Sequence, residues 1–152
     1  MKPRIEQKLL VKKDELFSLL NWIYGVKGVL LHPDRTVTST YFDTSSLLLF
    51  WHTQEGIVPR KKIRIRCYGN HGSSCQEKHS LETKMTTEHG RFKKIMDCPD
   101  WNYLIKRGIF DPDYGLCASM VKVSYRRSYF FVKDVRMTID RFISYKNTLT
   151  IS

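Results

Sequence analysis

The segment spanning residues 60–69 constrains the fold more than any other part of the chain. It alternates between cations and apolar side chains: Lys62, Arg64 and Arg66 on one side, and Ile63, Ile65 and Cys67 on the other. Because successive side chains of a strand point to opposite faces, this pattern predicts a strand with one apolar and one basic face. The chain is therefore expected to form a sheet whose second face is charged.

Five further segments are predicted to be strands. Residues 4–11 form a short strand that places Glu6 and Lys8 on one face. Residues 35–43 are rich in β-branched and aromatic side chains, and residues 81–86 alternate and form a hairpin with the basic strand. Two long final strands, 121–132 and 135–145, are joined by the two-residue turn Lys133-Asp134.

Three segments are predicted to be helices that pack on this sheet. The first is capped by Asp14 and ends at Gly25, with apolar residues at three- and four-residue steps. The second covers residues 47–54, with Leu48 and Trp51 inward. The third covers residues 100–107 and ends at a glycine. About six strands, mostly antiparallel, with two or three helices predict an α+β fold with a curved or barrel-like sheet.

Charge restricts the partners of this chain. Its 152 residues suit a single domain, 1–152, and carry a formal net charge of +11. Such an excess predicts a polyanionic partner: nucleic acid, an anionic membrane surface or a phosphorylated substrate. The longest apolar run, residues 47–51, is far shorter than the roughly 18 residues of a membrane span, so no span is expected.

The N-terminus has no apolar segment typical of a secretory signal, which predicts a cytoplasmic location. The four cysteines contain no C-x-x-C pair and are predicted to be free thiols. Cys67 and Cys75 flank a glycine-rich turn, but a disulfide between them is the less favoured alternative in a reducing compartment.

Six cations fall on the charged faces of the predicted strands: Lys8, Arg64, Arg66, Lys84, Arg127 and Arg136. If the sheet is flat, they form an ordinary solvated face. If it curls, they converge on a basic bore, which is tolerable only when an anion fills it, because unpaired buried cations are costly. Arginine suits a phosphate ligand, since its planar fork binds two oxygens at once.

Several motifs in order along the chain support the curled alternative: Arg-Ile-Glu-Gln-Lys at 4–8, Tyr-Phe-Asp-Thr at 41–44, Lys-Ile-Arg-Ile-Arg-Cys-Tyr-Gly at 62–69, Leu-Glu-Thr-Lys at 81–84, Ser-Tyr-Arg-Arg-Ser-Tyr at 124–129 and Arg-Met-Thr-Ile-Asp at 136–140. As a set they resemble the VTC (vacuolar transporter chaperone) domain, which is polyphosphate polymerase-like and belongs to the triphosphate tunnel metalloenzyme, or CYTH-like, superfamily. The resemblance implies an antiparallel β tunnel, a CYTH-like barrel with two or three packed helices.

The resemblance also implies a function: binding of polyphosphate, ATP or another triphosphate in a basic tunnel, and metal-dependent synthesis of polyphosphate from ATP. The six cations would then be phosphate ligands, with Arg127 preferred to Arg126 because the family spacing is Tyr-x-Arg from Tyr125. Glu6 and Glu82 would hold Mn²⁺ or Mg²⁺, hard cations that take oxygen ligands. Salt bridges within the basic tunnel are an equally acceptable role for these acids, and Asp140 is expected to orient an arginine.

Two departures from the family pattern affect these expectations. Arg4 replaces the first acid of the Glu-x-Glu-x-Lys motif of the CYTH branch, which disfavours a thiamine triphosphatase or an adenylyl cyclase. The family's closing Glu-x-Lys strand has no counterpart before Ser152, so an incomplete barrel is expected. Loss of that glutamate would impair metal-dependent transfer more than binding. The open sheet edge also predicts a dimer.

Three alternatives to a polymerase follow. One is a non-catalytic module that binds polyphosphate or an inositol phosphate, and another is a triphosphatase of the CYTH type. The third, nucleic-acid binding, requires aromatic side chains on the basic face to stack on bases. Tyr68 is the one candidate in line with Arg64 and Arg66, so nucleic acid is the least favoured partner.

Overall fold

Strands dominate the structure, a computed structural model that describes residues 6–69 and 78–149. Its strands are β1 (Val29–Asp43), β2 (Arg60–Gly69), β3 (His79–Thr87), β4 (Gly90–Asp97), β5 (Ile109–Asp111), β6 (Gly115–Val132) and β7 (Val135–Asn147). Its helices are the 3₁₀ turn η1 (Lys13–Glu15) and the α-helices α1 (Leu16–Gly25), α2 (Leu48–Gln54) and α3 (Trp101–Arg107).

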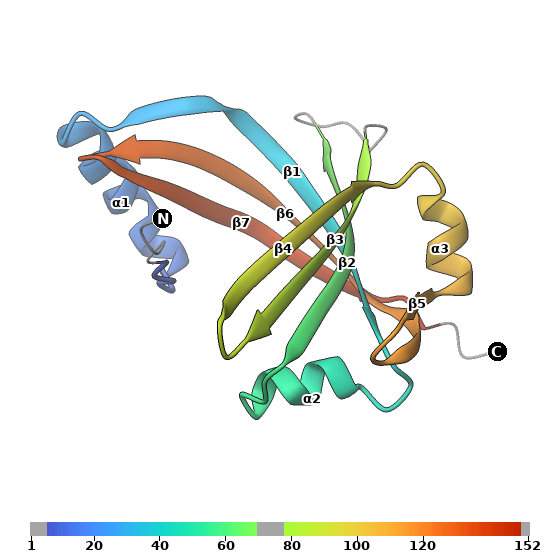
Figure 1. Cartoon of the computed structure of the whole chain (residues 1–152). Helices are drawn as coiled ribbons and strands as arrows, with labels where there is room; N and C mark the ends of the chain where they lie inside the picture. The colour runs from blue at the N-terminus through green and yellow to red at the C-terminus, as the bar shows by residue number, and fades with distance from the viewer. Residues whose placement is uncertain (1–5, 70–77, 150–152) are drawn as a thin grey trace.

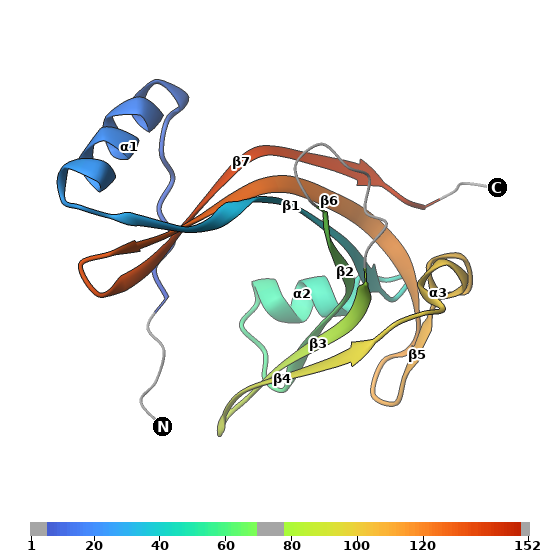
Figure 2. The same cartoon turned by 90° about the horizontal axis from the view of Figure 1, so that it is seen from above.

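The strands form an antiparallel sheet in the order β4-β3-β2-β1-β6-β5, with β7 also paired to β6. Figures 1 and 2 show that this sheet curls into a half-barrel, with β1, β6 and β7 in one wall and β2, β3 and β4 in the other. Within residues 6–69 and 78–149, β4 pairs with β3 and β7 with β6, so both strands are edges. The predicted α+β fold with an incomplete antiparallel barrel is therefore confirmed.

The two faces of β2 match the predicted alternation. Ile63 and Ile65 are buried in the main core with Phe42, and Trp101 and Leu104 of α3 pack against that core. Figure 2 shows α3 on the outer side of the curved sheet, so the isoleucine face is convex. The alternating cations of β2 consequently face the hollow.

Helix α2 lies across one end of the half-barrel (Figure 1). Asp43, the last residue of β1, accepts hydrogen bonds from the backbone N–H groups of Leu49 and Phe50, each at 2.9 Å. These bonds fix the rotation of the helix about its axis and turn Leu49 inward, where it is 3% exposed. The prediction that Leu48 and Trp51 face inward is wrong, since they are 40% and 50% exposed.

Helix α1 packs at the far end of β6, where Ile23 joins Phe130 and Val132 in a second core. The predicted cap is wrong, because Asp14 lies inside η1 and the helix begins at Leu16 without a side-chain cap. Gly28 leads the chain from α1 into β1. A Cβ there would lie 2.6 Å from Cγ2 of Ile23, so this close approach requires glycine.

Other local predictions were wrong or incomplete. Residues 6–11 form no strand, because no neighbouring strand pairs with them in the part of the chain that the structure describes. Strands β4 and β5 were not predicted. Cys98 and Cys117 are free thiols as expected, whereas Cys67 is disulfide-bonded, and Cys75 lies outside the described residues. The prediction of a free thiol is therefore wrong for Cys67.

Among the described helices, none combines the length and the apolar character that crossing a membrane requires.

Candidate functional site

Cations, tyrosines and two acids from six strands share the hollow side of the half-barrel. We call this set the concave basic face: Ser39 and Tyr41 of β1, Lys62, Arg64 and Arg66 of β2, Glu82 and Lys84 of β3, Lys93 of β4, Tyr125 and Arg127 of β6, and Asp140 of β7. Strand register brings them together, since Arg64 lies opposite both Tyr41 and Glu82, and Arg66 lies opposite Ser39.

Arg64 is held by an acid and a phenol. Its Nε donates to Oε2 of Glu82 at 2.7 Å, and its Nη1 donates to the hydroxyl of Tyr41 at 3.1 Å. Burial by itself would lower the pKa of Arg64, but Tyr41 and Glu82 outweigh it and raise that pKa. Lys93 donates to the other oxygen of Glu82 at 3.0 Å. The Glu82 side chain, 4% exposed, is thus enclosed between two cations.

Arg66 is buried, and its side-chain hydrogen bonds within the described residues go to neutral groups. The residue is 7% exposed, its Nε donates to Oγ of Ser39 at 2.8 Å, and its Nη2 donates to the hydroxyl of Tyr125 at 3.3 Å. Both partners are neutral, and no ion pair of Arg66 occurs within residues 6–69 and 78–149. A buried cation that lacks a counter-ion is costly, so this position favours an anion from outside the chain.

Arg127 and Tyr125 extend the face onto β6. The Arg127 guanidinium forms a two-bond ion pair with Asp140 and lies 5.1 Å from the centre of the Tyr125 ring. Burial raises the pKa of the Tyr125 phenol, and Arg66 and Arg127 offset only part of this shift. The neutral phenol therefore contacts one arginine through its hydroxyl and another through its ring.

Three lysines lie in a row across the β2 side of the hollow. Lys62 lies directly opposite Lys84, and Lys84 directly opposite Lys93. Burial lowers the pKa of Lys62, as do the nearby charges of Lys84, Lys8 and Arg60, against an opposing effect of Tyr41. Like charges that face each other across strands are destabilising, so this row also favours a bound anion.

The structure brings together four of the six predicted phosphate ligands: Arg64, Arg66, Lys84 and Arg127. Lys8 lies outside any strand, and its side chain is 88% exposed. Its charge helps to lower the pKa of Lys62 on the face. Arg136 lies at the start of β7, opposite Phe131 and exposed, near the turn to β6. Arg126 points to the opposite face from Arg127, as expected.

The two predicted metal ligands do not meet. Glu6 is exposed and lies 4.0 Å from Lys8, while both oxygens of Glu82 already bind cations. Across the described part of the chain, no group of three or more His, Cys, Asp or Glu side chains is placed to hold a metal. As placed, these carboxylates do not fit a shared Mn²⁺ or Mg²⁺ site, and salt bridges account for both.

Sequence reasoning missed Ser39, Tyr41, Tyr125 and Lys93 as members of the face. Both tyrosines occur within the motifs quoted above, but only the strand register shows that they lie beside the arginines. Tyr68 is therefore not the sole aromatic residue among the cations. The hydroxyls of Tyr41 and Tyr125 bind Arg64 and Arg66, so these two phenols form part of the hydrogen-bonding network.

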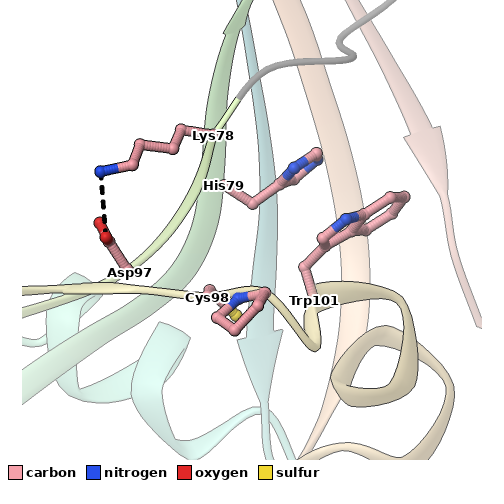
Figure 3. Close-up of a pocket in the computed structure, with 6 residues that line it drawn as sticks. Lys78, His79, Asp97, Cys98 and Trp101 are labelled. Atoms are coloured by element: carbon pink, nitrogen blue, oxygen red, sulfur yellow. Dashed lines mark ion pairs between the residues drawn. The ribbon is translucent and has the colours of Figure 1, made fainter.

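A separate hollow of about 310 Å³ lies beside α3 (Figure 3). It is lined by Lys78, His79, Asp97, Cys98, Pro99 and Trp101. The rings of His79 and Trp101 stack with centroids 4.1 Å apart, and Lys78 pairs with Asp97 at 3.0 Å. None of the predicted site residues lines it, so it is distinct from the concave basic face.

Comparison with known proteins identifies one family. The family model described as the VTC domain matches residues 3–101, well over half of the chain. The matched segment contains β1 to β4, and with them Arg64, Arg66, Glu82 and Lys84. No curated protein matches the chain.

Proposed function

Because the chain belongs to the VTC-domain family, we propose that its concave basic face binds a linear chain of phosphates, either inorganic polyphosphate or the triphosphate of a nucleotide. The observation that carries this proposal is Arg66, a buried guanidinium whose hydrogen-bond partners among the described residues, Ser39 and Tyr125, are neutral. A phosphate oxygen supplies the missing negative charge, and charge-assisted hydrogen bonds to guanidinium are among the strongest in proteins.

The spacing of the cations favours a chain of phosphates over a single one. Neighbouring strands lie about 4.8 Å apart, and alternate residues of one strand about 7 Å apart. Arg64 and Arg66 therefore offer charges at successive positions along β2, while Lys84 and Lys93 continue the set across β3 and β4. A linear polyanion can contact several of these positions at once.

Metal-dependent growth of polyphosphate from ATP, the activity that the family resemblance predicts, requires carboxylates that are free to hold a metal. Glu82 and Asp140, the acids of the concave basic face, are both bound to cations. The proposed function is therefore binding. Incubation with ATP and Mn²⁺, followed by assay for chain products and released phosphate, tests whether turnover also occurs.

The binding proposal is tested by titrating the protein with tripolyphosphate and with single-stranded DNA of equal charge. We expect the Arg64→Gln/Arg66→Gln variant to lose at least about tenfold in tripolyphosphate affinity, equivalent to about 1.4 kcal/mol. A charge-matched control, Lys106→Gln/Arg107→Gln, removes two exposed cations of α3 outside the face. Equal losses in the two variants, or equal affinity of the wild type for DNA, would contradict the proposal.

A further inference from the structure

A second basic surface lies on the opposite side of the sheet, across β6 and β7. Three cross-strand pairs form it: Lys122 opposite Lys146, Ser124 opposite Ser144, and Arg126 opposite Arg141. We call these six residues the convex basic patch. On β1, Thr40, Thr38 and Thr36 continue the same three rows.

The helices identify the side of the sheet on which this patch lies. Ser119, just before the patch on β6, donates a hydrogen bond to the backbone oxygen of Ile105 in α3, and Phe130, just after it, packs against Ile23 of α1. Figure 2 shows α1 and α3 at opposite ends of the outer side of the β6–β7 wall. The patch occupies the stretch of convex surface between them.

Three of its four cations have no counter-ion in the part of the chain that the structure describes. Arg141 pairs with Asp34, with Nη2 and Oδ2 2.6 Å apart. Lys122, Arg126 and Lys146 form no ion pair with any residue in the described ranges 6–69 and 78–149. The Arg126 guanidinium lies instead over the Phe142 ring, 5.4 Å from its centre. Like charges directly opposite each other destabilise a sheet, so the cation pairs on this face favour the binding of an anionic partner.

Hydroxyl groups fill the middle of the patch. Oγ1 of Thr38 lies 3.0 Å from Oγ of Ser124, and Ser144 donates to the backbone oxygen of Ser124 at 3.4 Å. The cations flank these hydroxyls at both ends, with Lys122 and Arg126 four residues apart, or about 13 Å along the strand. One phosphate cannot span that distance, whereas a chain of phosphates can.

We propose that the convex basic patch binds a second stretch of the same phosphate chain that occupies the concave basic face. This inference rests on the proposed function and extends it to long polyphosphate. Arg126 and Arg127 are neighbours on β6 that point to opposite faces, so the two surfaces share one strand. A long chain passes from one to the other around the edge at β7, while a triphosphate reaches only the concave basic face.

The test compares tripolyphosphate with polyphosphate of about 100 units on the Lys122→Gln/Lys146→Gln variant. We expect its affinity for the long chain to fall about tenfold, equivalent to about 1.4 kcal/mol, and its affinity for tripolyphosphate to stay unchanged. Two lost phosphate contacts should also reduce the slope of log affinity against log salt by about 1.4–1.8. The melting temperature without ligand should rise, because a like-charge pair is removed.

The α3 control Lys106→Gln/Arg107→Gln removes the same charge elsewhere. The inference is overturned if this control loses as much long-chain affinity as the patch variant. It is equally overturned if the affinity of the patch variant for tripolyphosphate falls as much as its affinity for the long chain. It is also overturned if the patch variant binds the long chain with unchanged affinity but no longer binds phosphatidylserine vesicles, since the patch is then a membrane-binding surface. Failure of Arg64→Gln/Arg66→Gln to weaken tripolyphosphate binding would contradict the proposed function and the inference that rests on it, whereas the outcomes above contradict the inference alone.

Discussion

Asp140 accepts two hydrogen bonds from the guanidinium of Arg127, one from Nε at 2.6 Å and one from Nη2 at 2.8 Å. The two residues lie directly opposite each other on β6 and β7. This geometry agrees with the expectation that Asp140 orients an arginine. It also means that an anion in the hollow competes with a resident carboxylate for the same guanidinium.

Asp140→Asn should therefore tighten the binding of tripolyphosphate severalfold, because it removes a negative charge and releases the fork of Arg127. The cost in stability should not exceed about 1 kcal/mol, since both side chains are partly exposed. Calorimetric titration and urea unfolding measure the two effects. Weaker binding would show instead that Arg127 contributes to tripolyphosphate affinity only when Asp140 orients its guanidinium.

Glu82 should make the stability of the protein depend on pH in the acid range. Burial raises the pKa of this carboxyl, but hydrogen bonds from Lys93 and Arg64 outweigh burial and hold the pKa below its ordinary value of 4.5. The ionised form is therefore favoured by folding. Its contribution is complete above pH 4.5 and is lost as the pH falls through the lower pKa of the folded state.

Glu82→Gln should lower the free energy of unfolding at pH 7 by about 1.5–3 kcal/mol, the usual value of hydrogen bonds to a charged group. The difference between wild type and variant should shrink below pH 4.5. Urea unfolding at pH 7 and at several acid pH values measures it. A difference that stays constant over this range would mean that the carboxylate charge contributes nothing.

Adjacent residues of β2 should affect different properties. Ile65→Ala should lower the free energy of unfolding by about 2–5 kcal/mol, because Ile65 is 2% exposed in the main core. It should leave the affinity of the folded protein for tripolyphosphate unchanged. Arg64→Gln should lower the affinity for tripolyphosphate. A loss of affinity in both variants would show that the two faces of β2 are not independent.

Removing the arginines is not expected to stabilise the fold. From the sequence alone, deleting like charges from one face relieves repulsion. In the structure Arg64 holds the buried Glu82, and Arg66 binds Ser39 and Tyr125, so these contacts are lost as well. Arg64→Gln should therefore cost about 1.5–3 kcal/mol, measured by urea unfolding.

Divalent cations alone should have little effect on this protein. The oxygens of Glu82 are bound to Arg64 and Lys93, so a metal would have to displace two cations. We expect Mn²⁺ or Mg²⁺ without phosphate to leave the melting temperature unchanged. A rise that Glu82→Gln abolishes would identify Glu82 as a metal ligand.

Alternation was the most informative signal in the sequence. It located β2 and β3, assigned the faces of Ile63 and Arg64 correctly, and identified most of the cations of the hollow. The edge strand β4 was missed because nearly all of its residues are exposed and its apolar residues follow no period of two. Residues 6–11 were predicted as part of a strand, yet a strand also needs a partner, and the local sequence does not supply one.

The hairpin pairings of β2 with β3 and of β6 with β7 were predicted, but contacts between strands that are distant in the sequence could not be predicted from it. Tyr125 lies 59 positions from Arg66 along the chain, and only the register of β1 with β2 and β6 brings the two together. The rotation of α2 depends likewise on the carboxylate of Asp43. Arg66 was predicted to bind phosphate, but the absence of an acidic partner for it among the described residues became visible only in three dimensions.

The open side of the half-barrel determines how a ligand arrives. A closed bore admits a polymer only by threading, which requires a free end and becomes slower as the polymer lengthens. Between the edges β4 and β7 the described part of the sheet forms a trough, and a polymer can settle into a trough sideways, at any point along its length. Molecules without ends then become acceptable ligands, so cyclic phosphates and polymers blocked at both ends should enter as readily as free linear chains.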